Sequence, residues 1–249
     1  MKQLQAALMF FTRLPLNRLA NVPAEYFHRV VPYWPLTGWV TSGCTAAVLT
    51  IAALFLPANI ALLLAMTARL LLTGCLHEDG LADFLDGFGG GSNRERTLAI
   101  MKDSHIGTYG TVGLVFYFLL FYFLLESLPV EYAACAILAG DPFSKMTAGM
   151  IVNRLPYART AEASKTKSVY SPMNGREYFY TFLFGLLPLL WLPGIHFAGA
   201  TVFPLIALWL LTSLMKRKIG GYTGDCCGAT FLLCELAFYL ACTLIYHLQ

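Results

Sequence analysis

Charged residues are scarce in this sequence of 249 residues, because Asp, Glu, Lys and Arg together make up only 12%, against about 25% in soluble globular proteins. Hydrophobic residues reach 57%, and the mean hydropathy is +0.62. This balance excludes a soluble monomer, and the abundance of large apolar residues excludes intrinsic disorder. The sequence also lacks the Gly-X-Y period of collagen and any sustained heptad. A polytopic membrane protein remains.

The sequence has no C-x-x-C pair among its seven cysteines. That absence argues against a zinc site and against a disulfide framework, so we interpret the cysteines as reduced, small hydrophobic residues. The net charge is only +3. Because the basic residues lie on one side of the predicted membrane, we attribute this small positive excess to membrane topology. We therefore expect no nucleic-acid partner.

Basic residues lie on one side of the predicted membrane. If the N-terminus is cytoplasmic, the inside segments are 1–32, 77–108, 153–177 and 216–228, which carry four, three, five and three Lys or Arg, or 15 of the 17. The connections on the other side carry none. The positive-inside rule describes this asymmetry. Chemistry is therefore expected on the cytoplasmic side, where the polar segments gather.

We predict an all-α, polytopic integral membrane bundle of about seven transmembrane helices, with a cytoplasmic N-terminus. A spanning helix needs about 20 mostly apolar residues to cross about 30 Å of hydrocarbon. Residues 1–249 form one catalytic domain, with cytoplasmic loops near 77–108, 153–177 and 216–228. The predicted spans are residues 33–56, 58–76, 109–128, 132–152, 178–194, 198–215 and 229–248.

Three aspartates follow the second predicted span. At about 100° per residue, Asp79, Asp83 and Asp86 fall at about 0°, 40° and −20° around a helix, which is one narrow face. Carboxylates this close repel one another, and Mg²⁺, which takes oxygen ligands from carboxylates and substrate phosphates, would compensate them. Glu78 lies about 100° away and is the weaker ligand candidate. The alternative is a solvated acidic loop beside the membrane.

Glycines and basic residues follow the aspartates. The run 87–91 contains four glycines, whose backbone N–H groups can approach an anion closely. Arg94, Arg96 and Lys102 are candidates for neutralising phosphate charge, and His105 lies in the adjacent loop. The alternatives are a flexible loop for the glycines and a purely topological role for the basic residues.

Further ionisable residues lie in or beside the predicted spans. Asp225, at the start of the last span, is either a metal ligand, a base or a helix-capping residue. Within the fourth span, Asp141 and Lys145 are four residues apart and can pair on one face. Such residues inside a bilayer are costly and are functional candidates by default, although a structural ion pair explains them equally well. Arg69 and Glu235 also fall within spans.

These motifs together resemble the cobalamin synthase family, the adenosylcobinamide-GDP ribazoletransferases. The resemblance begins with F-T-R-L-P at 11–15, continues through H-E-D-G-L-A-D-F-L-D-G at 77–87 and M-K-D-S-H-I-G-T-Y-G at 101–110, and ends with G-D-C-C-G-A at 224–229. It covers nearly the whole chain in order, and the acidic element is its most specific part. The family usually has an aliphatic residue where this sequence has Glu78.

The resemblance implies a Mg²⁺-dependent enzyme of the bacterial cytoplasmic (inner) membrane with its active site on the cytoplasmic side. Such an enzyme joins adenosylcobinamide-GDP to α-ribazole or α-ribazole 5′-phosphate, which releases GMP. The resemblance leaves open whether the chain forms a homo-oligomer or associates with other cobalamin assembly enzymes. We predict metal ligands at Asp79, Asp83, Asp86 and Glu78, catalytic roles for Asp83, Asp86, Asp103 and Asp225, and substrate binding by Arg94, Arg96, Lys102, His105 and Lys145.

Two other functions fit parts of the pattern. A CDP-alcohol phosphotransferase also holds metal on an Asp-rich helix, but its motif requires Arg after Ala and wider Asp spacing, whereas Asp83 and Phe84 follow Ala82 here. In an ion-coupled transporter the ionisable residues of the spans would line a path. Against a transporter, the acidic residues lie in a cytoplasmic loop and no inverted repeat is evident.

Overall fold

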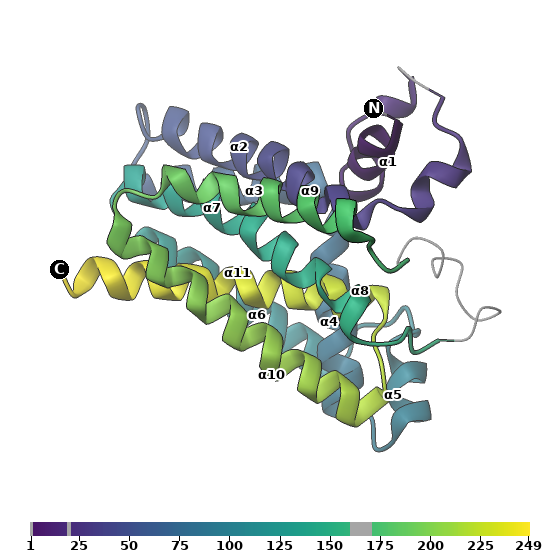
Figure 1. The fold of residues 1–249 in the computed structure, drawn as a ribbon. Coiled ribbons are helices and arrows are strands. Elements are labelled where there is room, and N and C mark those ends of the chain that lie inside the picture. The colour runs from purple at the N-terminus through teal and green to yellow at the C-terminus, as the bar shows by residue number, and fades with distance from the viewer. Residues whose placement is uncertain (1, 19–20, 160–170) are drawn as a thin grey trace.

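The computed structural model describes residues 2–18, 21–159 and 171–249, and these form a bundle of helices that run side by side (Figure 1). The described residues contain no strand, and an isolated bridge joins Tyr157 and Tyr222. The predicted all-α class is therefore confirmed. The long elements are α2 (Trp34–Ala52), α3 (Ala58–Thr73), α6 (Thr108–Glu126), α7 (Val130–Gly149), α9 (Gly175–Leu186) continued by η4 (Leu187–Trp191), η5 (Ile195–Thr201) continued by α10 (Val202–Ile219), and α11 (Gly224–His247).

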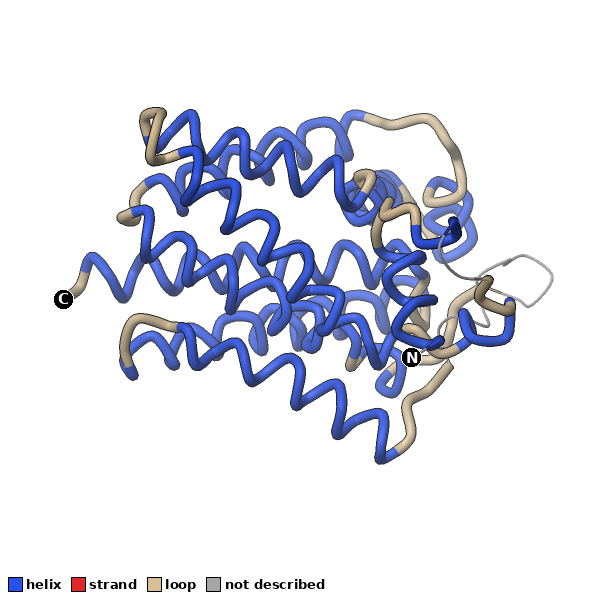
Figure 2. The backbone as a smooth tube through the Cα atoms, turned by 90° about the horizontal axis from the view of Figure 1, so that it is seen from above, coloured by secondary structure: helices blue, strands red, loops and turns tan. Residues whose placement is uncertain are grey.

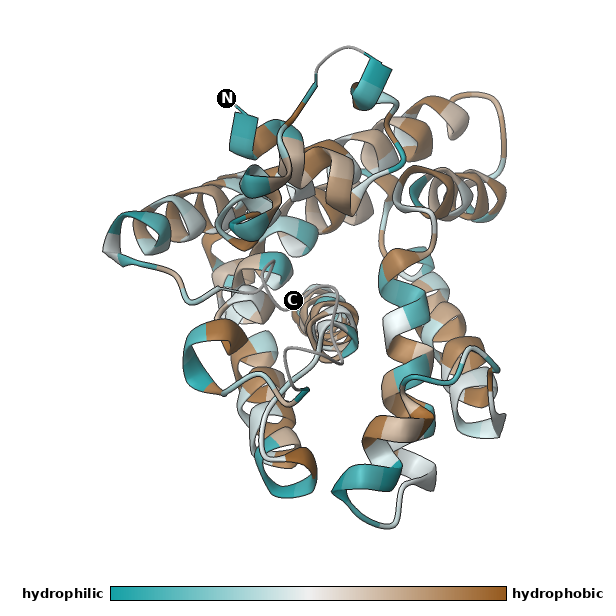
Figure 3. Ribbon diagram, turned by 90° about the vertical axis from the view of Figure 1, so that its right-hand side faces the viewer, coloured by the Kyte–Doolittle hydropathy of each residue, from teal (hydrophilic) through white to brown (hydrophobic). Residues whose placement is uncertain are grey.

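Shorter helices gather at one end of this bundle, which we call the polar end. In Figure 1 they lie at the end opposite the C-terminus. Figure 3 looks along the bundle from the polar end and shows the C-terminal helix, α11, running through the middle. These short elements are α1 (Lys2–Phe11), η1 (Leu16–Arg18), η2 (Ala24–His28), η3 (Val31–Tyr33), α4 (Leu76–Gly90), α5 (Arg94–Ile100) and α8 (Ile151–Arg154).

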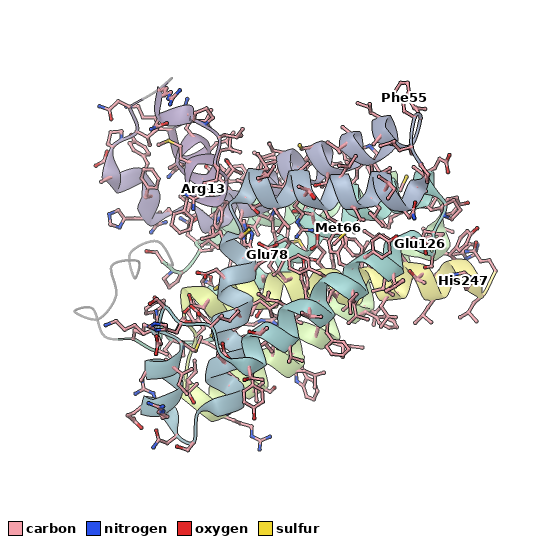
Figure 4. The ribbon with its side chains drawn as sticks, turned by 180° about the vertical axis from the view of Figure 1, so that it is seen from behind. Arg13, Phe55, Met66, Glu78, Glu126 and His247 are labelled. Atoms are coloured by element: carbon pink, nitrogen blue, oxygen red, sulfur yellow. The ribbon has the colours of Figure 1, made fainter. Side chains whose placement is uncertain are left out.

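The long helices alternate in direction. Short connections at 53–57, 127–129 and 192–194 lie at the C-terminal end of the bundle (Figure 2), and Phe55 and Glu126 are found there in Figure 4, far from Arg13 at the polar end. Each stretch predicted as a span is helical for most of its length. The longer, polar connections all return to the polar end.

Several helices are apolar enough to be membrane spans, so the chain is a membrane protein. Among the described residues α6, η5–α10 and α11 meet the length and composition of a span, and α3 with α4 makes a fourth if this bent pair counts as one. In the apolar 18-residue stretch of α6, and in that of η5–α10, only 22% is buried inside the protein, whereas 61% of the corresponding stretch of α11 is buried. The outer helices thus turn apolar side chains away from the protein, while α11 forms its centre.

Four of the ionisable residues within the bundle form two ion pairs. Arg69 on α3 donates two hydrogen bonds to the Glu235 carboxylate on α11, at 2.9 and 2.7 Å. On α7, Lys145 contacts Asp141 at 2.6 Å, as the four-residue spacing indicated. Thr41 of α2 donates to Asp141 Oδ2 at 2.8 Å. These pairs neutralise buried charge, which would otherwise be costly in an apolar bundle.

Candidate active site

A sharp bend brings the acidic helix α4 across the polar end. The α3 and α4 axes differ by 88°, because Gly74 and Cys75 both adopt left-handed backbone conformations, with φ of 64° and 57°. Glycine takes this conformation at little cost, and the Arg13 side chain packs so closely over Gly74 that a Cβ there would overlap it. The F-T-R-L-P segment is therefore part of the bend that directs α4.

The first turns of α4 pack against the N-terminal end of α11. A Cβ on Gly80 would lie 3.2 Å from the Asp225 backbone, so the glycine permits the close approach of the two helices. This contact brings Asp225 near the α4 aspartates, and we call Asp79, Asp83 and Asp225 the acidic cluster. Asp79 is exposed, while Asp83 and Asp225 are half-buried. Asp225 does not cap α11, because the cap is the Thr223 side chain.

Burial and the neighbouring carboxylates of the acidic cluster shift the pKa of Asp83. Partial burial, followed by the charges of Asp225 and Asp79, raises the pKa of the Asp83 carboxyl from 3.8 to about 7. Arg159 opposes this effect. Its guanidinium forms an ion pair with Asp225 Oδ2 at 3.1 Å and donates to the Met101 carbonyl at 3.2 Å. One cation therefore faces several carboxylates, and the cluster favours binding a further positive charge.

The donor chemistry of the cluster fits Mg²⁺. Its ligand atoms are carboxylate oxygens, which this ion prefers, and Mg²⁺ usually keeps several waters and uses one or two carboxylates together with substrate phosphates. Within the described ranges no three acidic, histidine or cysteine side chains are grouped closely enough to hold an ion by themselves. The described side chains of the cluster therefore do not form a closed metal site by themselves.

Asp86 has other partners, although it lies on the same helical face. Gly107 N donates to Asp86 Oδ2 at 2.7 Å, and Gly110 N donates to Asp86 Oδ1 at 2.9 Å. Both glycines are required, because a Cβ on either would lie 2.5 Å from an Asp86 oxygen. The carboxylate thus satisfies orphan N–H groups at the start of α6, where the helix dipole favours a negative charge. Asp86 joins α4 to the 101–110 segment.

Glu78 lies on a different side of α4 and faces the bundle. Its side chain is buried, and its Oε2 has no hydrogen-bond partner among the described residues. It lines a small cavity with Arg69, Tyr117 and Phe121. The structure therefore separates Glu78 from the acidic cluster.

The predicted phosphate-binding residues divide into two groups. Arg94 donates to the carbonyls of Ile219 and Ala158, at 2.9 and 2.8 Å, and so holds the end of α10. The other residues are exposed at the polar end, and His105 Nδ1 lies 2.7 Å from Asp103 Oδ1. Hydrogen bonds from His105 lower the pKa of the Asp103 carboxyl. This exposed group comprises Arg96, Lys102 and His105, and the predicted catalytic residue Asp103 lies beside His105.

Lys145 lies in the interior, away from the exposed basic residues. It is 1% exposed, is paired with Asp141, and donates to Thr41 Oγ1 at 2.6 Å. Its Nζ also sits 4.8 Å from the centre of the Phe231 ring. These contacts occupy the ammonium group, and the structure does not bring it together with the acidic cluster.

Sequence reasoning missed two parts of the site. In the sequence, Arg159 is one of the five basic residues of segment 153–177, and no spacing connects it to Asp225. The second part is a cavity of about 140 Å³ beside Asp79 and Asp225, walled by aromatic rings from three helices. Phe11 in the F-T-R-L-P segment belongs to that wall, which was the available signal. Its rings include Phe10, Phe11, Trp34 and His77.

A membrane helix bundle with carboxylates, an arginine and exposed basic residues at one end has the composition of a phosphoryl-transfer site. The sequence comparisons specify the family. Residues 3–243 match the model of the family described as cobalamin-5-phosphate synthase. The chain therefore belongs to the cobalamin-5-phosphate synthase family.

Curated relatives support this membership over nearly the full chain. The adenosylcobinamide-GDP ribazoletransferase of Shewanella frigidimarina is 38% identical over 241 residues, which is 94% of this chain and 91% of the relative. The protein of the same name from Shewanella amazonensis is 38% identical, covering 96% of this chain and 94% of the relative. The comparison with solved structures found no match.

Proposed function

We propose that this chain acts as an adenosylcobinamide-GDP ribazoletransferase at the acidic cluster, with Mg²⁺ as its cofactor. Membership of the cobalamin-5-phosphate synthase family supports the activity. The observation that carries the location is the convergence of Asp79 and Asp83 from α4 with Asp225 from α11. The substrates are adenosylcobinamide-GDP and α-ribazole or its 5′-phosphate.

The reaction is a phosphoryl transfer. A ribose hydroxyl of the acceptor attacks the phosphorus attached to cobinamide, the bond from that phosphorus to the bridging oxygen of GMP breaks, and GMP leaves. The hydroxyl proton passes to a carboxylate. Such transfers need positioning and charge neutralisation more than covalent help from the protein.

The residues of the polar end have separate roles in this proposal. Asp79, Asp83 and Asp225 would hold Mg²⁺, which when bound neutralises charge developing on the departing phosphate. Arg96 and Lys102, both exposed at the same end, attract the diphosphate. Asp86 has a structural role, because it fixes the start of α6.

Asp225 and Asp103 are the two candidates for accepting the proton. Asp225 lies in the cluster beside Arg159, whereas Asp103 is exposed and held by His105. The pH dependence of turnover separates them. If Asp225 accepts the proton, Asp225→Asn abolishes the fall in rate at low pH and Asp103→Asn keeps it. If Asp103 accepts the proton, the two variants behave the other way round.

We further propose seven membrane crossings and a cytoplasmic polar end, in a bacterial cytoplasmic membrane. The alternating directions of the long helices support the crossings. A helix the length of α2, 19 residues, measures about 28 Å, close to the hydrocarbon thickness. The short connections at the opposite end contain no Lys or Arg, which supports the orientation. Thiol labelling of the variants Phe55→Cys and Glu95→Cys in intact cells tests this orientation. We expect the introduced cysteine to react at residue 55 and not at residue 95.

The direct test of the reaction measures GMP release from adenosylcobinamide-GDP by the full-length protein in liposomes. We expect release that requires both α-ribazole and Mg²⁺. Asp83→Asn should lower the rate by at least about 100-fold, because it removes a ligand of the catalytic ion. Glu95→Gln, which neutralises an exposed acid on α5, is the matched control and should keep the rate. Release without an acceptor, or full activity of Asp83→Asn, would contradict the proposal.

A further inference from the structure

The aromatic cavity beside the acidic cluster has the features of a binding pocket. Its volume is about 140 Å³, similar to a cavity of about 150 Å³ that accommodates a benzene ring. Phe11 and Trp34 stack with ring centroids 5.0 Å apart and planes within 11°, and His77 lies nearly parallel to Trp34 at 5.7 Å. These three rings are almost fully covered by one another and by the rest of the protein, and the partly buried Phe10 completes an aromatic lining, which suits a planar aromatic ligand.

The wall also carries hydrogen-bonding atoms without partners. Trp34 is 2% exposed and His77 is 3% exposed. Trp34 Nε1 and both ring nitrogens of His77 lack a hydrogen-bond partner among the described residues. Because burying such groups unpaired costs free energy, native structures rarely leave them so. Three of these atoms on two residues lining one cavity indicate a ligand that carries complementary nitrogen or oxygen atoms.

The other side of the cavity places this ligand relative to the reaction. Asp79 and Asp225 line the cavity together with the aromatic wall, and both belong to the acidic cluster. A ring bound against the wall would therefore keep its substituent beside the carboxylates. This is the geometry that a nucleoside needs when its base is held and its ribose hydroxyl reacts.

We propose that the cavity binds the planar nitrogen heterocycle of the acceptor nucleoside, packed against Phe10 with its free ring nitrogen accepting a hydrogen bond from Trp34 Nε1. This inference rests on the proposed ribazoletransferase function. Ribazole carries a benzimidazole-type base, which is apolar apart from that one accepting nitrogen. A mostly aromatic pocket with few polar groups matches it.

The donor offers a second planar heterocycle, its guanine. Guanine presents several donors and acceptors around its edge, and a pocket walled by Phe10, Phe11 and Trp34 would leave most of them unpaired. Asp79 and Asp225 are assigned to the metal ion beside the reacting phosphates, so the polar atoms left in the wall are the ring nitrogens of Trp34 and His77. The pocket therefore fits the acceptor base better than the guanine of the donor.

Trp34→Phe tests the assignment, because it removes Nε1 and keeps an aromatic wall. We expect the KM for α-ribazole to rise about five-fold, as for the loss of one neutral hydrogen bond, with the KM for adenosylcobinamide-GDP unchanged. Trp39→Phe is the matched control on the same helix. Trp39 Nε1 donates to the Phe184 carbonyl at 2.8 Å, away from the cavity, and its loss should leave both KM values unchanged.

A second variant keeps the test valid if Trp34→Phe folds poorly. Phe10 is only partly buried, so Phe10→Leu should fold, and the loss of stacking should raise the KM for α-ribazole at least about five-fold. An unchanged acceptor KM in both variants would overturn the proposal. A rise in the donor KM alone would also overturn it and assign the cavity to guanine.

Equilibrium dialysis separates this inference from the reaction itself. Wild-type protein in detergent should retain radiolabelled α-ribazole in preference to GMP at the cavity, and Trp34→Phe should retain it about five-fold more weakly. If the wild type releases no GMP yet shows this difference in binding, the proposed function fails and the pocket stands. If the wild type turns over and both proteins retain α-ribazole equally, the pocket fails and the function stands.

Discussion

The contact of Asp86 with the start of α6 yields a quantitative prediction for Gly110→Ala. The new Cβ would lie 2.5 Å from Asp86 Oδ2 and 3.0 Å from the Ala82 carbonyl oxygen, so the helix start must move and the hydrogen bond from Gly110 N to Asp86 is lost. A hydrogen bond to a charged group contributes about 1.5–3 kcal/mol. The higher helix propensity of Ala returns about 0.5–1 kcal/mol, which leaves a net destabilisation of about 1–2 kcal/mol.

Gly43→Ala is the matched control. Gly43 also lies within a long helix, α2, but a Cβ there meets nothing within 4 Å. At about 2–4 °C per kcal/mol for a chain of this size, Gly110→Ala should lower the Tm of the purified protein by about 2–8 °C. Gly43→Ala should raise it by about 1–4 °C. Equal shifts in the two variants, measured by thermal unfolding in detergent, would refute the role of Asp86 at the start of α6.

Two further predictions test the electrostatics. The pKa of Asp83 is raised from 3.8 to about 7 in the folded protein, so the folded state binds this proton more tightly than the unfolded state. The free energy of unfolding of the metal-free protein should therefore fall as pH rises from about 4 to 7. Asp83→Asn should remove this slope and have a higher Tm than the wild type at pH 8 in EDTA; a lower Tm would count against mutual repulsion in the cluster. Glu235→Ala leaves the buried Arg69 charge unpaired and should destabilise the protein by about 3–5 kcal/mol. The double variant Arg69→Met with Glu235→Leu should regain most of that Tm loss, and a double variant no more stable than Glu235→Ala would contradict the pairing.

Much of the architecture could be predicted because long apolar runs indicate helices directly. The stretch 33–56 became α2 at Trp34–Ala52, and 229–248 became α11 at Gly224–His247. The pairing of Asp141 with Lys145 also followed from spacing alone, because residues four apart are neighbours on any helix. Local periodicity was sufficient for these features.

The composition of the site was harder to predict because it depends on which elements meet. Helical spacing put Asp86 on the face of Asp79 and Asp83, but it could not show that Gly107 and Gly110 lie across from Asp86. Arg159 reaches Asp225 over 66 positions in the chain, and no local pattern encodes such a contact. The aromatic cavity likewise requires rings from α1, α2 and α4 to converge. These contacts follow from the bend at Gly74 and Cys75, which places α4 across the polar end.

In the proposed function, carboxylates from α4 and α11 together hold the catalytic ion. The most direct measurement is a Mg²⁺ titration of acceptor-dependent GMP release for the wild type, Asp225→Asn and the exposed-acid control Glu95→Gln. Because Asp225 is the α11 member of the cluster, we predict that Asp225→Asn needs at least about 100-fold more Mg²⁺ for half-maximal release, while Glu95→Gln titrates like the wild type. A wild-type titration curve for Asp225→Asn would show that the ion is held without α11 and would contradict the account.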